Sequence, residues 1–525
     1  MPSVMSHDFS KVPHANIQRS MFNRSSGLKT TFDAGKLIPC FVDEVVPGDS
    51  FNLKMSAFAR LATPLHPVMD NMYLDTFFFF VPNRLVWDNW EKFNGEQTNP
   101  GDSTDYLVPK VFCPGGGYAE GTTADYFGIP TKVDLDAGLS GPVVNALPFR
   151  GLNLIYNEWF RDENLVDSVP VPKDDGPDSW TTDYNDGALL NRGKRHDYFT
   201  SALPWPQKSD AVSLPLGTTA PIATNSIGSN STILDNDPIG SGGYVKLSSS
   251  TSFVTPSATV GSSSDRLYTD LTSATAATIN DLREAFQVQK MYEKDARGGT
   301  RYTEIVKSHF GVTSPDARLQ RPEYLGGGTT RVNVSPIAQT SSTDATTPQG
   351  NLAALGTAGI HDHGFNKSFT EHGYIIGIVC ARADLTYQQG INKMWLRDDR
   401  FDFYWPSLAH LGEQAIENRE LYAQGTTADL DVFGYQERYA EMRYKPSSIT
   451  GLFRSNATQS LDTWHLSQEF GSLPVLGETF ITENLPIDRV IATPNEPHFI
   501  MDCFFDLKCA RPMPMYGVPG FIDHF

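Results

Sequence analysis

Cysteine and long apolar runs are both scarce in this sequence. Only five cysteines occur among 525 residues, and no two of them have the Cys-x-x-Cys spacing of a zinc or redox motif. A disulfide framework is therefore excluded, and we expect reduced thiols, as in a cytoplasmic protein. No apolar stretch approaches the roughly 18 residues of a membrane-spanning helix. The first ten residues are polar and lack the apolar region of a signal peptide.

An excess of positive charge is also missing. The chain has 42 Lys and Arg against 61 Asp and Glu, for a net charge of −19. A protein that coats nucleic acid over its whole surface is basic, because phosphate contacts come from Lys and Arg. If this chain encloses DNA, it therefore needs local basic patches, cations or a basic partner.

Known catalytic motifs are missing as well. There is no Walker A motif and no Gly-x-Ser-x-Gly, and the glycine runs at 115–117 and 326–328 are expected to be flexible turns. His361, Asp362 and His363 could be metal ligands by residue type, but we expect a solvated loop there. We expect the adjacent carboxylates Asp398 and Asp399 to be solvated charges in a turn. We therefore expect no enzyme, no cofactor and no metal.

Two segments have the apolar pattern of β-strands. Residues 51–61 alternate between apolar and mostly polar side chains, which predicts a strand with one buried face. Residues 72–81 end in a run that is apolar on both faces, which predicts a strand between the core and a further layer such as a helix, an insertion or a neighbouring subunit. Further strands are expected at 374–380, 461–466, 489–492 and 499–507, and weaker ones at 402–405 and 432–435.

Helices are few by the same criteria. Apolar side chains with helical spacing predict helices over 152–160 and 279–297, and residues 84–93 are a third candidate. Many short strands without regular strand–helix alternation indicate an all-β sandwich or jelly roll. Cys380 and Cys503 lie in apolar runs and are expected in the core.

The chain divides into four parts by composition. Residues 1–36 carry five basic and two acidic residues, a local charge of +3, and predict a basic N-terminal arm. Residues 37–208 are expected to hold the first part of the sandwich with insertions. Residues 209–278 are rich in Ser and Thr and poor in charge, which predicts a surface insertion or small β-rich excursion. Residues 279–525 hold the remainder, with a loop-rich stretch at 338–366 and a C-terminal extension.

The densest basic patch is Arg192, Lys194, Arg195 and His196. Together with Tyr198, Phe199, Trp205 and the N-terminal arm, it could present charge and stacking surfaces to single-stranded DNA. A subunit interface or an ordinary surface patch is the alternative. The candidate nucleic-acid contacts are Lys11, Arg19, Arg24, Lys29, Arg192, Lys194 and Arg195.

Four long segments of the sequence resemble a known protein family. They are similar to segments of the major capsid protein of the Microviridae. The four segments are KLIPCFVDEVVPGDSFNL at 36–53, ARLATPLHPVMDN at 59–71, YLDTFFFFVPNRLVW at 73–87, and residues 190–207, which end in DYFTSALPWPQ. The likeness is greatest to the gokushovirus branch, and it covers essentially the whole chain.

The resemblance implies an eight-stranded antiparallel jelly roll with long insertions. It implies a sixty-copy T=1 icosahedral shell, built through pentamer intermediates, that encloses circular single-stranded DNA in a virion assembled in the host bacterial cytoplasm. It further implies four partners: a DNA pilot protein, an internal scaffolding protein, a small basic DNA-binding protein and a host surface receptor. The insertion at 209–278 matches a threefold protrusion used in host attachment, with Asn230, Asp235, Tyr244 and Phe253 as its candidate residues.

A second hypothesis stays open at this point. The 8 Trp and 20 Tyr in an all-β chain also suit a carbohydrate-binding or glycoside-processing β-sandwich.

Overall fold

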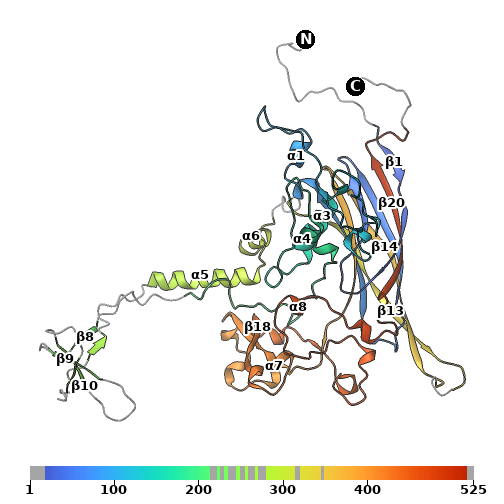
Figure 1. Ribbon diagram of the computed structural model, residues 1–525. Helices are drawn as coiled ribbons and strands as arrows, with labels where there is room; N and C mark the ends of the chain where they lie inside the picture. Colours follow the sequence, from blue (N-terminus) through green and yellow to red (C-terminus); the bar gives the residue numbers. More distant parts are fainter. Residues whose placement is uncertain are drawn as a thin grey trace. The chain divides into compact units, whose positions relative to one another are not determined.

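The computed structural model divides the chain into two units, each described by itself (Figure 1). The first comprises Met1–Pro206 and Thr300–Phe525, and the second is Gln207–Gly299. The structure describes all residues except 1–17, 213–221, 225–229, 235–243, 249–254, 258–266, 270–278, 314–319, 344–347 and 517–525.

The first unit is built on two antiparallel four-stranded sheets. One has the order β2-β20-β4-β14 and the other β3-β15-β5-β13, and β13 joins them by pairing first with β5 and then with β14. Strand β1 pairs with β20 beyond the end of β2. The strands are β1 Ser20–Asn23, β2 Ser26–Phe32, β3 Ile38–Val45, β4 Ser50–Leu61, β5 Met72–Pro82, β13 Glu323–Ala338, β14 Leu352–Ser368, β15 Gly373–Ala383 and β20 Phe499–Arg511.

This strand order is that of a jelly roll. Strands β2, β4, β14 and β20 form one sheet and β3, β5, β13 and β15 the other, so most consecutive strands fall in opposite sheets, as in two interleaved Greek keys. The predicted all-β fold class is confirmed. Part of the predicted N-terminal arm is instead β-strand, because Ser20–Asn23 and Ser26–Phe32 pair with β20 of the main sheet.

The period-two pattern of β4 places its apolar side chains between the two sheets. Every second residue from Phe51 to Leu61 is buried, and the residues between them are exposed. Strand β20 repeats the pattern from Phe499 to Cys509. The main core therefore fills the space between the sheets, and it includes Cys503. Burial of each such large apolar side chain contributes about 1.5–3 kcal/mol to folding.

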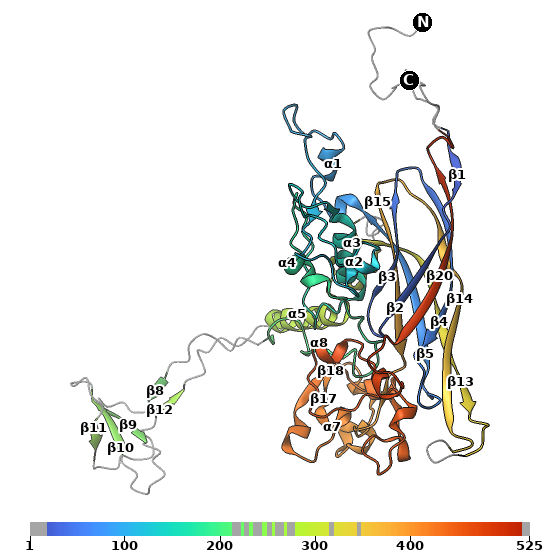
Figure 2. The same ribbon diagram turned by 45° about the vertical axis from the view of Figure 1, so that its right-hand side comes forward.

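Strand β5 is buried on both faces, as predicted. Phe78 and Phe80 point into the main core, whereas Phe79 and Val81 belong to a second cluster on the outer face of their sheet. Helix α3 (Leu147–Ile155) covers that face, as Figure 2 shows. Cys380 lies in the same outer cluster. The further layer over β5 is thus a helix of the same chain.

Two glycine- and histidine-bearing segments were expected to be loops and are strands. Gly326 lies in β13, where an added Cβ would stand 2.4 Å from the backbone oxygen of Gly364. Glycine is therefore needed for the close approach of two strands and does not mark a flexible turn. Residues 352–366 of the expected loop form β14, and His361 and His363 lie at its bulge.

Three strand predictions are wrong, and one of them, at 402–405, was among the weaker ones. Residues 461–466 contain a 3₁₀ turn at Asp462–Trp464, residues 489–492 follow a similar turn at Ile487–Arg489, and residues 402–405 follow one at Arg400–Asp402. The strand at 432–435 is confirmed as β18 (Val432–Glu437). Residues 84–93 form two short turns, Asn83–Leu85 and α1 (Trp90–Phe93), and residues 152–160 are the end of α3 and a π-turn at Tyr156–Phe160.

The first unit contains further short elements outside the jelly roll. The strands are β6 Lys110–Val111, β7 Val144–Asn145, β16 Thr386–Tyr387, β17 Glu413–Glu417 and β19 Ser447–Ser448. The helices are α2 Thr123–Tyr126, α4 Trp180–Tyr184, α6 Tyr302–Phe310, α7 Asn418–Leu421 and α8 Glu478–Ile481. No helix in the described part of the chain is long and apolar enough to cross a membrane.

The second unit consists of two small sheets and the predicted helix α5 (Ile279–Arg297). Its strands pair in the orders β11-β10-β9 and β12-β8. They are β8 Ile222–Thr224, β9 Asn230–Leu234, β10 Tyr244–Ser248, β11 Thr255–Ser257 and β12 Leu267–Thr269. Helix α5 is therefore grouped with the Ser/Thr-rich insertion and not with the jelly roll.

Candidate nucleic-acid interface

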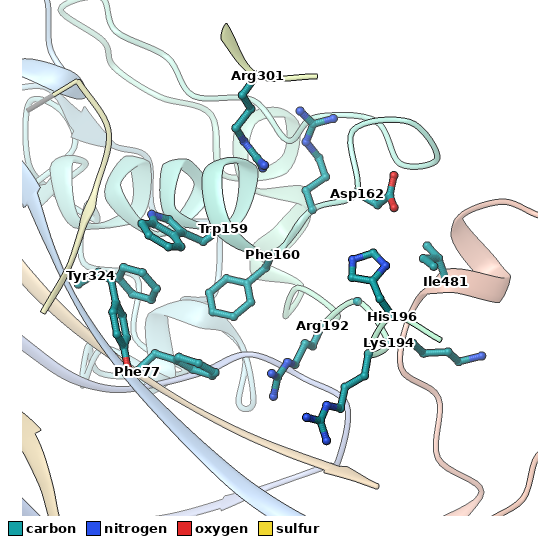
Figure 3. A pocket seen from close by; sticks show the side chains of 14 residues that line it. Phe77, Trp159, Phe160, Asp162, Arg192, Lys194, His196, Arg301, Tyr324 and Ile481 are labelled. Atoms are coloured by element: carbon teal, nitrogen blue, oxygen red, sulfur yellow. The ribbon is translucent and has the colours of Figure 1, made fainter. Parts of the chain in front are cut away.

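A cavity of about 600 Å³ opens on the outer face of β5 in the first unit (Figure 3). Figure 3 shows aromatic side chains along one side and basic side chains along the other. Five lining residues are Arg or Lys and one is acidic, so the cavity is basic by composition in a strongly acidic chain. Its lining residues are Phe77, Phe79, Trp159, Phe160, Arg161, Asp162, Arg192, Gly193, Lys194, Arg195, His196, Arg301, Tyr324 and Ile481.

The aromatic side of the cavity is a set of rings in mutual contact. Phe77 and Phe79 come from the outer face of β5, and their ring centres lie 5.2 Å from Phe160 and 5.5 Å from Trp159, respectively. Tyr324 of β13 lies 5.5 Å from Phe79. Trp159 donates a hydrogen bond from Nε1 to the carbonyl of Pro322 at 2.9 Å. The rings therefore have fixed positions, while Trp159 and Tyr324 keep exposed surface.

Arg192 connects the cavity to the core. Its Nη1 lies 2.5 Å from Oδ2 of the buried Asp75, and its guanidinium carbon lies 5.1 Å from the centre of the Phe77 ring. Burial disfavours the charged form of Asp75, but hydrogen bonds from Arg382, Thr329 and Arg192 outweigh burial and lower the pKa of Asp75. Most of the charge on Arg192 is therefore matched inside the protein.

Lys194 is also engaged inside the protein. Its Nζ donates to Gln468 at 3.0 Å and lies 4.7 Å from the centre of the Phe480 ring. Burial lowers the pKa of Lys194, although the nearby carboxylates of Glu483 and Asp197 oppose this shift. Burial raises the pKa of Glu483 to about 7 against the pull of Lys194, Arg192 and Arg382. Lys194 therefore interacts mainly with groups inside the protein.

Arg195 and His196 are the exposed basic residues of the cavity. The side chain of Arg195 is 59% exposed, and its nearest carboxylate, Asp384, is 3.8 Å away. Arg301 differs, because Glu163, Glu158 and Glu304 lie 2.5–3.6 Å from its guanidinium. The charge available to an incoming anion is therefore concentrated at Arg195, which lines the same cavity as the aromatic rings.

This arrangement suits a nucleotide in a single strand. Nucleobases stack on aromatic side chains with about 1–3 kcal/mol per base, without a strong sequence preference. An exposed guanidinium in the same cavity can donate charge-assisted hydrogen bonds to the phosphate oxygens. The cavity offers both features in one place, and its aromatic residues come from three separate segments of the chain.

The predicted contacts of the N-terminal segment that the structure describes do not line this cavity. Arg19 donates to the carbonyl of Gly48, and Arg24 is bound through both Nη atoms to Asp43. Lys29 is 83% exposed and lies 3.4 Å from Asp502, on the outer face of the sheet that contains β2 and β20. Lys11 lies outside the described residues.

Two aromatic residues expected to stack on DNA cannot do so. Tyr198 and Phe199 are buried in a cluster with Phe433 and Phe480, because the segment after His196 turns inward. Trp205 is half-buried and does not line the cavity. The rings that do line it were not predicted, since Phe77 and Phe79 read as strand residues and Trp159 and Phe160 as the face of a helix. Only the long-range pairing of β5 with β13 brings Tyr324 to them.

The candidate protrusion residues belong to the second unit. Asn230 begins β9 and Tyr244 begins β10, and these two strands pair in antiparallel register. Asp235 and Phe253 lie outside the described residues.

His363 is a half-buried, hydrogen-bonding residue of β14 and not part of a solvated loop. Its Nδ1 lies 2.8 Å from Thr76 Oγ1 and its Nε2 lies 3.2 Å from Thr330 Oγ1. Burial lowers the pKa of His363. Both ring nitrogens therefore serve the contact between β14 and its neighbours β5 and β13.

Comparison with known proteins gives full-length matches. A family model described as "Capsid protein (F protein)" matches residues 10–521. A protein named capsid protein VP1 from Bdellovibrio phage phiMH2K is 52% identical, over 99% of this chain and 98% of the relative. Proteins of the same name from Chlamydia phage 1 and Spiroplasma virus 4 are 46% and 38% identical, over 99% and 98% of this chain and 98% and 97% of each relative.

Proposed function

Because this chain belongs to the phage capsid protein (F protein) family, we propose that sixty copies of it form a T=1 icosahedral shell around circular single-stranded DNA. Membership confirms the resemblance to the Microviridae capsid proteins, and the chain is a capsid protein of this kind. The virion is therefore its place of action. Assembly in the host bacterial cytoplasm through pentamers, and a purely structural role without catalysis, belong to the proposal.

The fold supports a shell subunit. A jelly roll is a rigid two-layered body, and its loops and insertions are free to form contacts with several neighbours. In a closed icosahedral shell those contacts are heterologous around rotation axes, so each subunit must present different surfaces to different neighbours. The full-length match to capsid proteins favours this role over the carbohydrate-binding alternative.

The basic and aromatic cavity beside Arg195 is the proposed contact with the packaged strand. It is the observation that supports DNA contact by this chain, because it joins exposed rings to an available positive charge. The net charge of −19 makes such contacts local. A small basic DNA-binding protein would neutralise the remaining phosphates, and a DNA pilot protein and an internal scaffolding protein complete the proposed set of partners.

The second unit is proposed to form the threefold protrusion and to contact the host receptor. Its helix α5 carries exposed apolar side chains at Ile279, Leu282 and Phe286, which follow an i, i+3, i+7 spacing. Such a stripe on a helix is normally buried against another helix. Contact between copies of α5 around a threefold axis would bury it.

Ultraviolet cross-linking of purified particles tests the DNA contact. Digestion to peptides and mass spectrometry should find nucleotide adducts on peptides that carry Trp159 or Tyr324, whose rings are exposed in the cavity. Adducts confined to peptides that contain no lining residue of the cavity would refute this site.

A further inference from the structure

One short segment of the first unit exposes an unusual number of large apolar side chains. Trp395 is 74% exposed, and the others in the segment are between 40% and 59% exposed. They follow β15 and β16 in the chain, and they lie in two short 3₁₀ turns, Lys393–Trp395 and Arg400–Asp402, and in the residues just after the second turn. We call the following six residues the aromatic platform: Met394, Trp395, Phe401, Phe403, Tyr404 and Trp405.

The backbone of the platform is held in place by buried groups. The hydroxyl of Tyr439 lies 3.2 and 3.0 Å from the carbonyl oxygens of Phe401 and Phe403, so its proton is shared between them. Arg397 is bound to Glu441 at 3.0 Å, and both of these side chains are less than a tenth exposed. The backbone that carries the exposed rings is therefore fixed, and the segment is not a loose loop.

Contacts among the side chains fix the rings further. The Arg400 guanidinium lies 4.6 Å from the centre of the Trp405 ring, and Trp405 donates from Nε1 to the carbonyl of Arg400 at 3.0 Å. The Tyr404 ring packs edge-on against Tyr439 at 5.2 Å. A surface that is ordered before it binds loses little side-chain entropy on binding.

The charge of this segment argues against a nucleic-acid ligand. Residues 391–411 contain three basic residues (Lys393, Arg397, Arg400) and three acidic ones (Asp398, Asp399, Asp402), so 3 − 3 = 0. Lys393 is moreover paired with Glu420 at 2.8 Å. A strand of phosphates needs a net positive surface. Aromatic, Met and Arg side chains without net charge are the composition of a protein–protein interface core.

The size of the platform also fits a protein partner. At roughly 200 Å² per aromatic side chain, exposed fractions of 40–74% for the five rings leave on the order of 500 Å² of accessible surface. A standard interface takes about 800 Å² from each partner. The platform would therefore supply most of one side of such an interface.

We propose that the aromatic platform is a subunit contact, and that its occupant in the shell is a second copy of this chain. The inference rests on the proposed shell, since a capsid protein must bury apolar surface against its own copies to close one. The contact is heterologous: the platform of one copy packs on a different surface of its neighbour. Trp395 and Phe401, as exposed rings, are its principal anchors.

The test compares assembly of the full-length chain, with its scaffolding partner if wild type needs one, for Trp395→Asp, Phe401→Asp and Leu107→Asp. Leu107 is 81% exposed and lies outside the platform, so this variant measures the effect of one added surface carboxylate. We expect both platform variants to keep the wild-type unfolding midpoint and to lose at least tenfold in shell yield by sedimentation, while Leu107→Asp assembles. Normal yield of the platform variants overturns the inference.

A photocross-linker identifies the occupant. With p-benzoylphenylalanine in place of Phe401, irradiated shells should give a covalent dimer of the chain, with the cross-link mapped to a different surface of the neighbour. Cross-links to DNA, to a segment of the same chain or to another virion protein overturn the inference. Failure of the wild-type chain to form any shell would instead reject the proposed function, and the two failures are thus distinguishable.

Discussion

Arg192 and Asp75 form a short ion pair between the wall of the candidate cavity and the interior of the jelly roll, with 2.5 Å between Nη1 and Oδ2. Asp75 lies on β5 and is almost fully buried. The same carboxylate oxygen accepts from Arg382 Nε at 2.6 Å. Because Arg192 helps to neutralise a buried charge, its first role is in folding, and a loss of DNA binding on its removal would be ambiguous.

Replacement of Arg192 should therefore lower stability. We expect Arg192→Ala to reduce the free energy of unfolding by about 2–4 kcal/mol, because breaking a buried pair leaves a poorly compensated charge. Urea unfolding of the unassembled chain measures it. Surface substitutions commonly change stability by less than about 0.5 kcal/mol. A change that small for Arg192→Ala would show that Arg382 alone suffices to neutralise Asp75.

Arg195 permits a cleaner test of DNA contact, since its side chain is 59% exposed and its nearest carboxylate is 3.8 Å away. We expect Arg195→Ala to weaken binding of a fluorescent oligodeoxythymidine and to reduce the slope of log K against log salt by about 0.7, the value for one phosphate contact on a single strand. Anisotropy titrations at several salt concentrations measure the slope. Lys445→Ala, an exposed cation outside the cavity, is the control. Equal slopes in both variants would remove Arg195 from the interface.

Glu483 should make stability depend on pH. Burial raises the pKa of Glu483 to about 7 in the folded chain, against an ordinary value of 4.5. A raised folded pKa means that its stabilising contribution is complete below about pH 4.5 and is lost as pH rises through 7. We expect the wild type to lose on the order of 1–3 kcal/mol across this window relative to Glu483→Gln.

Urea unfolding of both chains from pH 4.5 to 8 measures this difference. Glu496→Gln, at an exposed position, should follow the wild-type curve. Parallel curves for Glu483→Gln and the wild type would show that the carboxyl is charged throughout, held by Lys194, Arg192 and Arg382.

The close approach of β13 and β14 predicts a strong effect of one methyl group. A Cβ at position 326 would stand 2.4 Å from the backbone oxygen of Gly364, and backbone cannot easily move inside a sheet. We expect Gly326→Ala to destabilise the chain by about 1–3 kcal/mol in thermal or urea unfolding. A Cβ added at Gly115 would have no heavy atom within 4 Å, so Gly115→Ala should leave stability nearly unchanged. Equal stability of the two variants would contradict the reported strand contact.

Strands could be predicted from the sequence where apolar side chains alternate with polar ones, as in β4, or form a continuous run, as in β5. Strand β4 alternates from Phe51 to Leu61 because one face meets the core and the other meets water. Strand β13 pairs first with β5 and then with β14, and its Gly326 closely approaches Gly364 of β14, so glycines interrupt the apolar pattern in both strands. Their glycine and histidine residues therefore resembled loops.

The aromatic segment at 402–405 shows the opposite error. Phe403, Tyr404 and Trp405 have high strand propensity, but no partner strand pairs with them and their rings remain exposed. Propensity reports how a side chain suits a pleated surface, and it cannot tell an intramolecular surface from one formed by a partner.

The candidate cavity could be predicted only in part. Arg192, Lys194 and Arg195 are close in sequence, so their charge was visible. The pairing of Arg192 with Asp75 and the assembly of the rings depend on contacts between residues far apart in the chain. Local patterns carry no information on such contacts.

Electron cryomicroscopy of the chain expressed with its scaffolding partner tests the central claim most directly. The account predicts closed icosahedral shells of sixty copies, with 60 × 58.0 kDa, about 3480 kDa, of this chain in each, and with the β2-β20-β4-β14 and β3-β15-β5-β13 sheets visible in every copy. Particles with a different copy number, or only monomers under every assembly condition, would contradict it.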